Sequence, residues 1–190
     1  VALGKHIYDA YNKAFDCDPV SAFFGTIAFS KEVDIETAKH ISSMAVELVI
    51  APSYEQAAVK ILSENHYTKV IKLLTPLKDY KSLACEDIKI TPFGTLIQEV
   101  NKSELDKDLF KVVTKTKPTA EQIEDAVFAW KIAKHSKSCS AVVAKDFKTV
   151  AIAQGEINPI SVIEHALDHA CDASKDAVVA FDEPIPTVEC

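Results

Sequence analysis

Histidine, cysteine and lysine side chains that could do chemistry gather in the C-terminal half of the sequence. His165 and His169 are four residues apart, so they would share one face of a helix, and Cys171 follows closely. A zinc site would need a third ligand and further groups that orient the ligands. The residue after His165 is alanine, so the HExxH pattern is absent. We therefore expect a solvated helix face here and no metal site.

A second group of polar residues is basic and follows a predicted helix. Lys134, His135 and Lys137 come after an apolar stripe at helical spacing, and the helix dipole stabilises cations at a helix C-terminus. This electrostatic effect accounts for the cluster, and a contact with a phosphate is the alternative. The sequence has neither a glycine-rich phosphate loop nor a GxSxG motif. Spacing alone therefore predicts a soluble α/β domain without assigning it a reaction.

The overall composition excludes several classes of protein. The chain has 190 residues, 48% of them apolar, and a formal net charge of −7, which argues against a general nucleic-acid or acidic-membrane binder. No apolar stretch is long enough to predict a membrane span. The cysteines are widely spaced and form no CxxC pair, which predicts reduced thiols and a cytoplasmic protein. They are Cys17, Cys85, Cys139, Cys171 and Cys190.

The hydrophobic periodicity predicts strands that alternate with helices, which is typical of an α/β sheet covered by helices. Capping residues place helix starts at Asp34, Ser53, Thr119 and Asn158, and Thr119 and Gln122 have the spacing of a capping box. A first helix is expected over residues 5–15. Strands are expected over residues 22–29, 46–51, 70–74, 93–100, 140–145, 149–154 and 177–181, with one hairpin at 146–148 and a loop over 75–87. A charged stretch over residues 101–118 divides the chain into a front part, 1–105, and a back part, 106–190.

Several separated segments resemble one protein family and occur in the family's order. The segment DPVSAFFGTIAF at residues 18–29 is similar to the family's DPVSAFGGIIAF, and VELVIAP at 46–52 is similar to VEVVIAP. The segments VVTKTKP at 112–118 and FAWKIAKHSKS at 128–138 also match, and the opening VALG resembles the residues after the family's KHANPCG motif. The sequence therefore resembles the AICAR transformylase domain of the bifunctional AICAR formyltransferase/IMP cyclohydrolase, over nearly its whole length.

The resemblance implies a fold and an activity. The fold would be a pair of cytidine-deaminase-like α/β subdomains without the deaminase zinc, with residues 1–105 as the remainder of the first and 106–190 as the start of the second. The family transfers a formyl group from 10-formyltetrahydrofolate, its co-substrate, to the amine of the AICAR nucleotide in purine biosynthesis, without a metal. It works as a dimer with shared active sites, so we expect a homo-oligomer or an association with further parts of the parent enzyme.

The family's site residues are only partly kept. The acidic ligand of the nucleotide falls on Glu47 and is retained, and the folate-side aspartate falls on Asp182. Three other positions are substituted. The glycine that approaches the nucleotide becomes Phe24, an asparagine becomes Cys139, and an arginine becomes Pro159. A phenylalanine removes the close approach that glycine allows, and the other two changes remove polar donors.

The family's catalytic Lys-His pair precedes its NPCG motif, so that pair would lie upstream of Val1, and the family's C-terminal segment would follow Cys190. Three interpretations stay open at this point. The chain is a non-catalytic member of the family, such as a pseudoenzyme, or an internal fragment of one; it is a subunit completed by another chain; or it is a structural or interaction protein that retains the transformylase scaffold.

Overall fold

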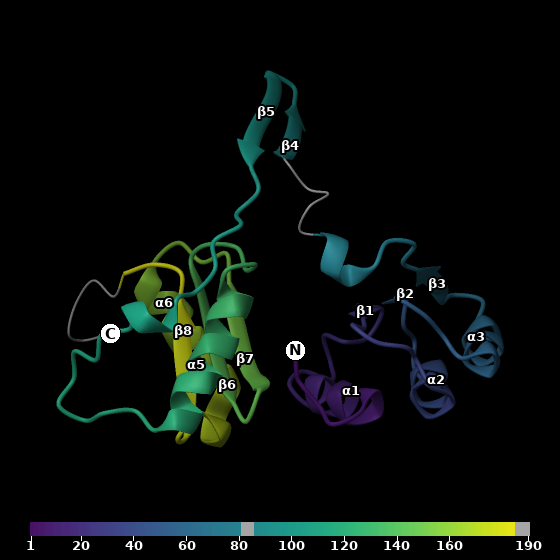
Figure 1. The fold of residues 1–190 in the computed structure, drawn as a ribbon, viewed down its shortest axis with the longest axis horizontal. Coiled ribbons are helices and arrows are strands. Elements are labelled where there is room, and N and C mark those ends of the chain that lie inside the picture. The colour runs from purple at the N-terminus through teal and green to yellow at the C-terminus, as the bar shows by residue number, and fades with distance from the viewer. Residues whose placement is uncertain (81–85, 185–190) are drawn as a thin grey trace. The chain divides into compact units, whose positions relative to one another are not determined.

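The computed structural model describes residues 1–80 and 86–184, and it contains two compact units (Figure 1). Unit 1 consists of Val1–Ala22 and Lys111–Cys190, and unit 2 is Phe23–Phe110. Each unit has its own sheet and helices, so each is described by itself. The predicted α/β class is confirmed, while the cytidine-deaminase-like layering and the division at residue 105 stay predictions.

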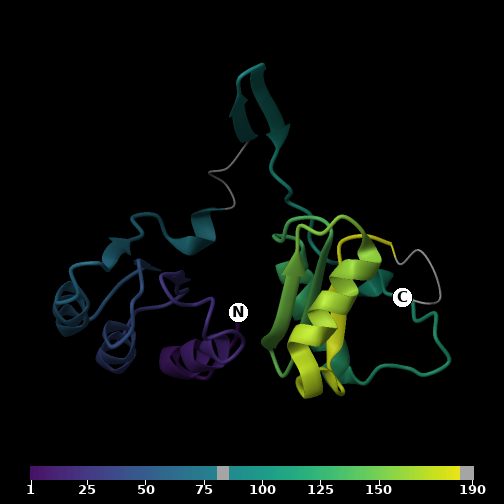
Figure 2. The same ribbon diagram turned by 180° about the vertical axis from the view of Figure 1, so that it is seen from behind.

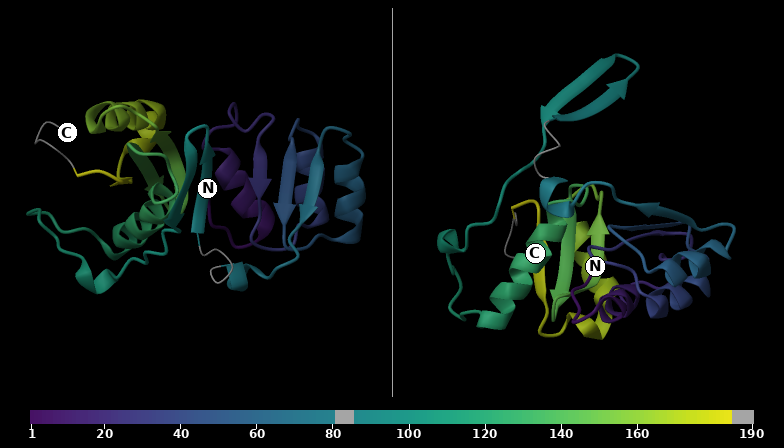
Figure 3. Two further views of the ribbon diagram at one scale, coloured as in Figure 1. Left: turned by 90° about the horizontal axis from the view of Figure 1, so that it is seen from above. Right: turned by 45° about the vertical axis from the view of Figure 1, so that its right-hand side comes forward.

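Unit 2 contains a three-stranded parallel sheet in the order β1-β2-β3, visible in the left view of Figure 3. The strands are β1 (Thr26–Ala28), β2 (Leu48–Ala51) and β3 (Lys69–Lys72), and they are connected through helices α2 (Ile35–Ser42) and α3 (Gln56–Ser63). This is the crossover connection that parallel strands require. The two helices contact each other. The apolar side chains buried in this unit include Val33, Ala38, Ile41, Val46, Val49, Ala51, Ala58 and Leu62.

The caps of the two helices in unit 2 show one prediction confirmed and one wrong. The Asp34 carboxylate accepts the Thr37 backbone N–H at 2.8 Å, so Asp34 caps α2 as predicted. Ser53 does not cap α3: its hydroxyl donates to the Glu32 carboxylate at 3.0 Å, and the helix starts two residues later, after Glu55. The physical reason is competition, because the nearby carboxylate takes the hydroxyl that would otherwise meet the helix.

Unit 2 also contains a hairpin of which only the second strand, over residues 93–100, was predicted. The strands β4 (Glu86–Thr91) and β5 (Gly94–Glu99) pair antiparallel (Figure 3, right), and a 3-10 turn, η1 (Leu77–Asp79), precedes them. The predicted loop over residues 75–87 is therefore wrong at both η1 and the start of β4. Charged residues alternate with isoleucines in β4, and they obscured a strand pattern that has only two apolar members. A further 3-10 turn, η2 (Lys107–Leu109), ends this unit.

Unit 1 contains an antiparallel sheet in the order β7-β6-β8 with one helix against each face (Figures 1 and 2). The strands are β6 (Ser140–Lys145), β7 (Lys148–Gln154) and β8 (Val178–Phe181). Helix α5 (Ala120–Ala133) packs on Val142 and Ala144, whereas α6 (Pro159–Ala170) packs on Ala141 and Val143. The alternation of side chains along a strand explains why one strand serves both faces.

Local capping and a buried carboxylate fix the remaining elements of unit 1. The predicted capping box of α5 is confirmed: Thr119 and Gln122 exchange both hydrogen bonds. Asn158 caps α6, and Pro159 occupies its first turn, as predicted. The predicted β6–β7 hairpin is also present, and the Asp125 carboxylate of α5 accepts both backbone N–H groups of its turn. Helix α1 (Ile7–Phe15) and the 3-10 turn η3 (Cys171–Ser174) complete the unit.

Candidate functional site

Two of the predicted site residues, Phe24 and Glu47, lie at the same end of the parallel sheet in unit 2, just before β1 and β2. The Phe24 N–H donates to the Ala45 carbonyl at 2.7 Å, and the Glu47 N–H donates to the Gly25 carbonyl at 3.1 Å. These bonds join the segment just before β1 to the segment just before β2. The Glu47 carboxylate is exposed and forms an ion pair with Lys69 at 3.1 Å. It can accept a hydrogen bond from a hydroxyl or amine, but Lys69 competes for it.

The backbone of Phe24 has the conformation that glycine adopts most readily. Its φ is +53°, in the left-handed region, and its side chain is 55% exposed. The ring meets Phe23 edge to face at 4.7 Å between centroids. The position predicted to correspond to a glycine therefore keeps a glycine-like backbone, while the space over it is taken by an aromatic ring.

The other three predicted positions lie together at one end of the sheet in unit 1. Cys139 and Glu156 exchange backbone hydrogen bonds at 3.3 and 3.4 Å, extending the β6–β7 pairing by one step. Pro159 begins α6 three residues after Glu156. Asp182 follows β8, and its carboxylate accepts the Ser140 N–H at 2.6 Å. The start of β6, the end of β8 and the start of α6 meet here because β6 and β8 are antiparallel.

Two polar contacts at this end of unit 1 were missed by the sequence analysis. The His165 imidazole lies 2.8 Å from the Glu156 carboxylate, and both side chains reach solvent. The Ser138 hydroxyl donates to the Glu183 carboxylate at 3.2 Å. His165 had been singled out for its spacing from His169, but its partner is Glu156, nine residues earlier. A contact between the loop after β7 and the second turn of α6 has no local sequence signal.

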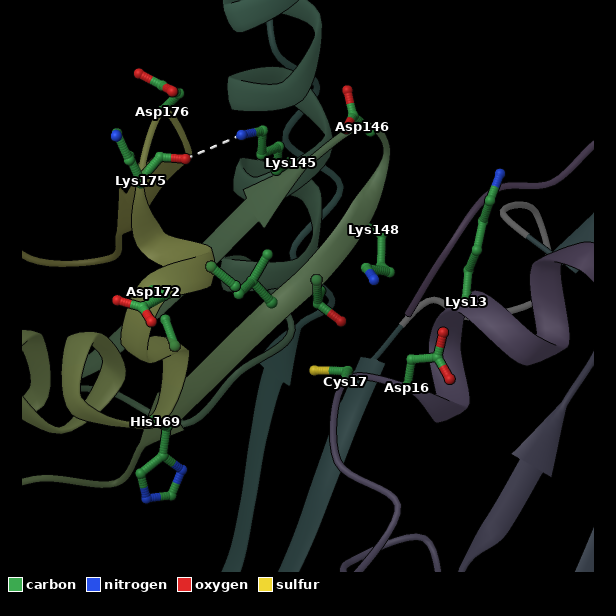
Figure 4. A pocket seen from close by; sticks show the side chains of 14 residues that line it. Lys13, Asp16, Cys17, Lys145, Asp146, Lys148, His169, Asp172, Lys175 and Asp176 are labelled. Carbon is green, nitrogen blue, oxygen red and sulfur yellow. Dashed lines mark hydrogen bonds between the residues drawn. The ribbon is translucent and has the colours of Figure 1, made fainter.

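His169 does not share the surroundings of His165. It lines a cavity of about 670 Å³ in unit 1, shown in Figure 4, which lies between α1, the β6–β7 hairpin and the end of α6 with η3. The cavity is strongly charged. Its lysines are Lys13, Lys145, Lys148 and Lys175. Its aspartates are Asp16, Asp146, Asp172 and Asp176. None of these was a candidate in the sequence analysis, because α1 is separated from the other elements by more than a hundred residues of sequence.

Among residues 1–80 and 86–184, no group of three or more histidine, cysteine, aspartate or glutamate side chains is arranged to hold a metal ion. Cys17, Cys139 and Cys171 have free thiols, and Cys85 and Cys190 lie outside the described residues. In the same part of the chain, no helix has the length and apolar character needed to cross a membrane. Lys134 is the C-cap of α5 and Lys137 follows it, so the basic cluster lies at a helix C-terminus as expected.

Comparison with known proteins gives the family. The profile of the AICARFT/IMPCHase bienzyme family matches residues 1–169. The chain belongs to this bienzyme family. The bifunctional purine biosynthesis protein PurH of Acetivibrio thermocellus is 40% identical over 100% of this chain and 37% of its own length. The PurH proteins of Thermoanaerobacter sp. and Fusobacterium nucleatum are also 40% identical, over 99% and 98% of this chain.

The match to the bienzyme family covers only part of each relative. The chain spans 36% to 37% of the length of these PurH proteins, while they cover nearly all of the chain. The resemblance to the AICAR transformylase family is thus confirmed as membership. The roles of Phe24, Glu47, Cys139, Pro159 and Asp182 stay predictions, because membership alone assigns no role to a single side chain.

Proposed function

We propose that this chain carries the substrate-facing scaffold of an AICAR transformylase and does not catalyse formyl transfer as the isolated chain. In the complete reaction, 10-formyltetrahydrofolate would donate the formyl group to the amine of the AICAR nucleotide, in a cytoplasmic pathway of purine biosynthesis. An amine on an aromatic carboxamide is a weak nucleophile. The reaction therefore needs positioned proton-transfer groups and donors to the developing oxyanion.

The observation that carries the proposal is Phe24. Its φ of +53° keeps the backbone geometry suited to a glycine, yet the exposed ring occupies the space a ligand would need for close approach. Cys139 and Pro159 point the same way. A thiol is a weak donor, and proline offers no side-chain donor, so neither can replace the polar groups of the family.

Ligand-dependent melting of the 190-residue chain tests this proposal. A ligand at 100 times its dissociation constant that binds only the folded state stabilises it by about 2.7 kcal/mol. We expect millimolar AICAR to leave the unsubstituted chain unshifted and to stabilise Phe24→Gly. Adding Glu47→Gln to Phe24→Gly should greatly reduce that shift, because the amide lacks the carboxylate's charge and has one acceptor oxygen instead of two.

Two results would overturn the proposal. One is turnover of AICAR and 10-formyltetrahydrofolate by the unsubstituted chain at a rate typical of enzymes, about several turnovers each second. The other is an AICAR-induced shift of equal size in the unsubstituted chain and in Phe24→Gly, which would show that the ring does not obstruct the site.

A non-catalytic role in assembly is the second candidate, and the β4–β5 hairpin favours it. Ile88, Ile90 and Ile97 lie on one face of a sheet of only two strands, and all three are more than half exposed. Such a hairpin is marginally stable unless something packs on it. Burial of this face in a homo-oligomer or against further parts of a parent enzyme would explain it. Sedimentation of the chain as a monomer at high concentration would count against this role.

A further inference from the structure

The charged cavity of unit 1 lies at the opposite end of the sheet from Cys139, Pro159 and Asp182. Those residues lie at the start of β6, the start of α6 and the end of β8, whereas the cavity is bounded by the end of β6, the start of β7 and the end of α6. Within unit 1, the cavity is therefore separate from the group formed by Cys139, Pro159 and Asp182. Its volume of about 670 Å³ is within the range of pockets that bind small molecules.

The distinguishing feature of the cavity is that its opposite charges do not pair with each other. Four lysines and four aspartates line it, so its formal charge is balanced. Lys13 pairs with Asp9 outside the cavity, and the Lys145 ammonium donates to the Lys175 carbonyl at 2.9 Å. Within the described part of the chain, no cavity lysine forms an ion pair with a cavity aspartate.

Two of the cavity aspartates lie at turns with an unusual backbone conformation. Asp146 and Asp176 occupy left-handed backbone positions, with φ of +53° and +59°, and Asp125 fixes the turn that contains Asp146. In Figure 4, Asp172 lies on the η3 side of the cavity, and Lys148 lies across from it on β7. Charges that form no ion pair with each other can attract a ligand's charges without first breaking an ion pair of their own.

We propose that this cavity binds a small zwitterion, a molecule that carries one ammonium and one carboxylate group, such as an amino acid. Its ammonium would meet an aspartate such as Asp172, and its carboxylate would meet Lys148. A ligand with only a negative charge would be attracted by the lysines but repelled by the nearby aspartates. A ligand with only a positive charge would be attracted by the aspartates but repelled by the lysines. A molecule with both charges gains from both sets, which a cavity of balanced and unpaired charge favours.

The test is a titration of the 190-residue chain followed by nuclear magnetic resonance of its backbone amides. The probes are 6-aminohexanoate and two analogues of similar length with one charge each, hexanoate and hexylamine. We expect saturable shifts with 6-aminohexanoate in the millimolar range, centred on the amides around Lys148 and Asp172. Hexanoate and hexylamine should bind at least about tenfold more weakly, since each lacks one charge-assisted contact.

Neutral substitutions locate the binding. Asp172→Asn and Lys148→Met should each weaken 6-aminohexanoate at least about tenfold, since each removes one charged partner. The matched controls Asp168→Asn on α6 and Lys131→Met on α5 change exposed charges outside the cavity and should leave affinity unchanged. Unchanged amide spectra show that each variant is folded. No saturable shift, equal binding of a singly charged analogue, or insensitivity to both cavity substitutions would overturn the proposal.

Discussion

The carboxylate of Asp125 offers the sharpest test of how unit 1 is held together. It is 8% exposed and accepts the N–H groups of Asp146 and Phe147 at 2.9 and 2.8 Å. These two residues form the β6–β7 turn, and both have positive φ, a conformation that costs free energy for residues with a side chain. Asp125→Asn preserves the shape of the side chain, but its amide group turns a donor toward one of the two N–H groups.

The expected cost follows from those two bonds. A hydrogen bond to a charged group contributes about 1.5–3 kcal/mol, and a buried N–H left without an acceptor costs a similar amount. We therefore expect Asp125→Asn to lower the free energy of unfolding of unit 1 by about 2–4 kcal/mol. Urea unfolding followed by the fluorescence of Trp130, the only tryptophan and a residue of α5, measures this unit.

Two further variants separate this mechanism from a general effect of charge removal. Glu164→Gln removes an exposed carboxylate on α6 and should change stability by less than about 0.5 kcal/mol. Asp146→Gly, placed in the Asp125→Asn background, should recover about 1 kcal/mol, because glycine adopts the left-handed conformation without strain. A loss from Asp125→Asn no larger than that of Glu164→Gln would refute the reasoning.

Three other predictions concern a half-buried phenol, a cap and the sheet core. Burial raises the pKa of Tyr54 to about 12, so folding favours the protonated phenol; this contribution is complete below pH 10 and is lost as pH rises toward 12. Ultraviolet titration should show that Tyr54→Phe removes a group that ionises near pH 12, and loss of a group near pH 10 would contradict the assignment. Thr119→Ala should destabilise unit 1 by about 1 kcal/mol in urea unfolding, and Thr119→Ser should restore most of it. Val142→Ala should lower the free energy of unfolding by about 2 kcal/mol in the same assay, since Val142 of β6 is fully buried against α5. A change below about 0.5 kcal/mol would contradict that packing.

Helix starts were predictable wherever the decisive contact spans three residues. Asp34, Thr119 and Asn158 each cap a helix by accepting the backbone N–H of the residue three positions later. Both partners of each bond are therefore close together in the sequence. Ser53 was predicted wrongly because its hydroxyl bonds to Glu32, twenty-one residues earlier. That partner comes close only once the sheet has formed, so no local pattern could reveal the competition.

The sites show the same limit more strongly. Family resemblance located Cys139, Pro159 and Asp182, and the structure brings them to one end of a sheet, which their spacing in the sequence does not predict. The charged cavity could not be predicted at all. Its walls come from α1 and from residues 145–176, and lysines and aspartates in those segments look like ordinary solvated surface until the fold places them around one space.

The phenylalanine at position 24, where the resemblance predicts a glycine, is not explained by the packing of unit 2. The backbone there is set by bonds that no side chain makes: the Phe24 N–H donates to Ala45, and Glu47 donates to Gly25. A phenylalanine at φ +53° bears roughly 1–2 kcal/mol of strain that glycine would avoid. Burial does not offset that strain, because the ring is 55% exposed. The ring therefore contributes little to the fold, and under the proposed function it obstructs a ligand that approaches this end of the sheet beside Glu47. Phe24→Gly is the substitution that separates lost ligand access from lost scaffold.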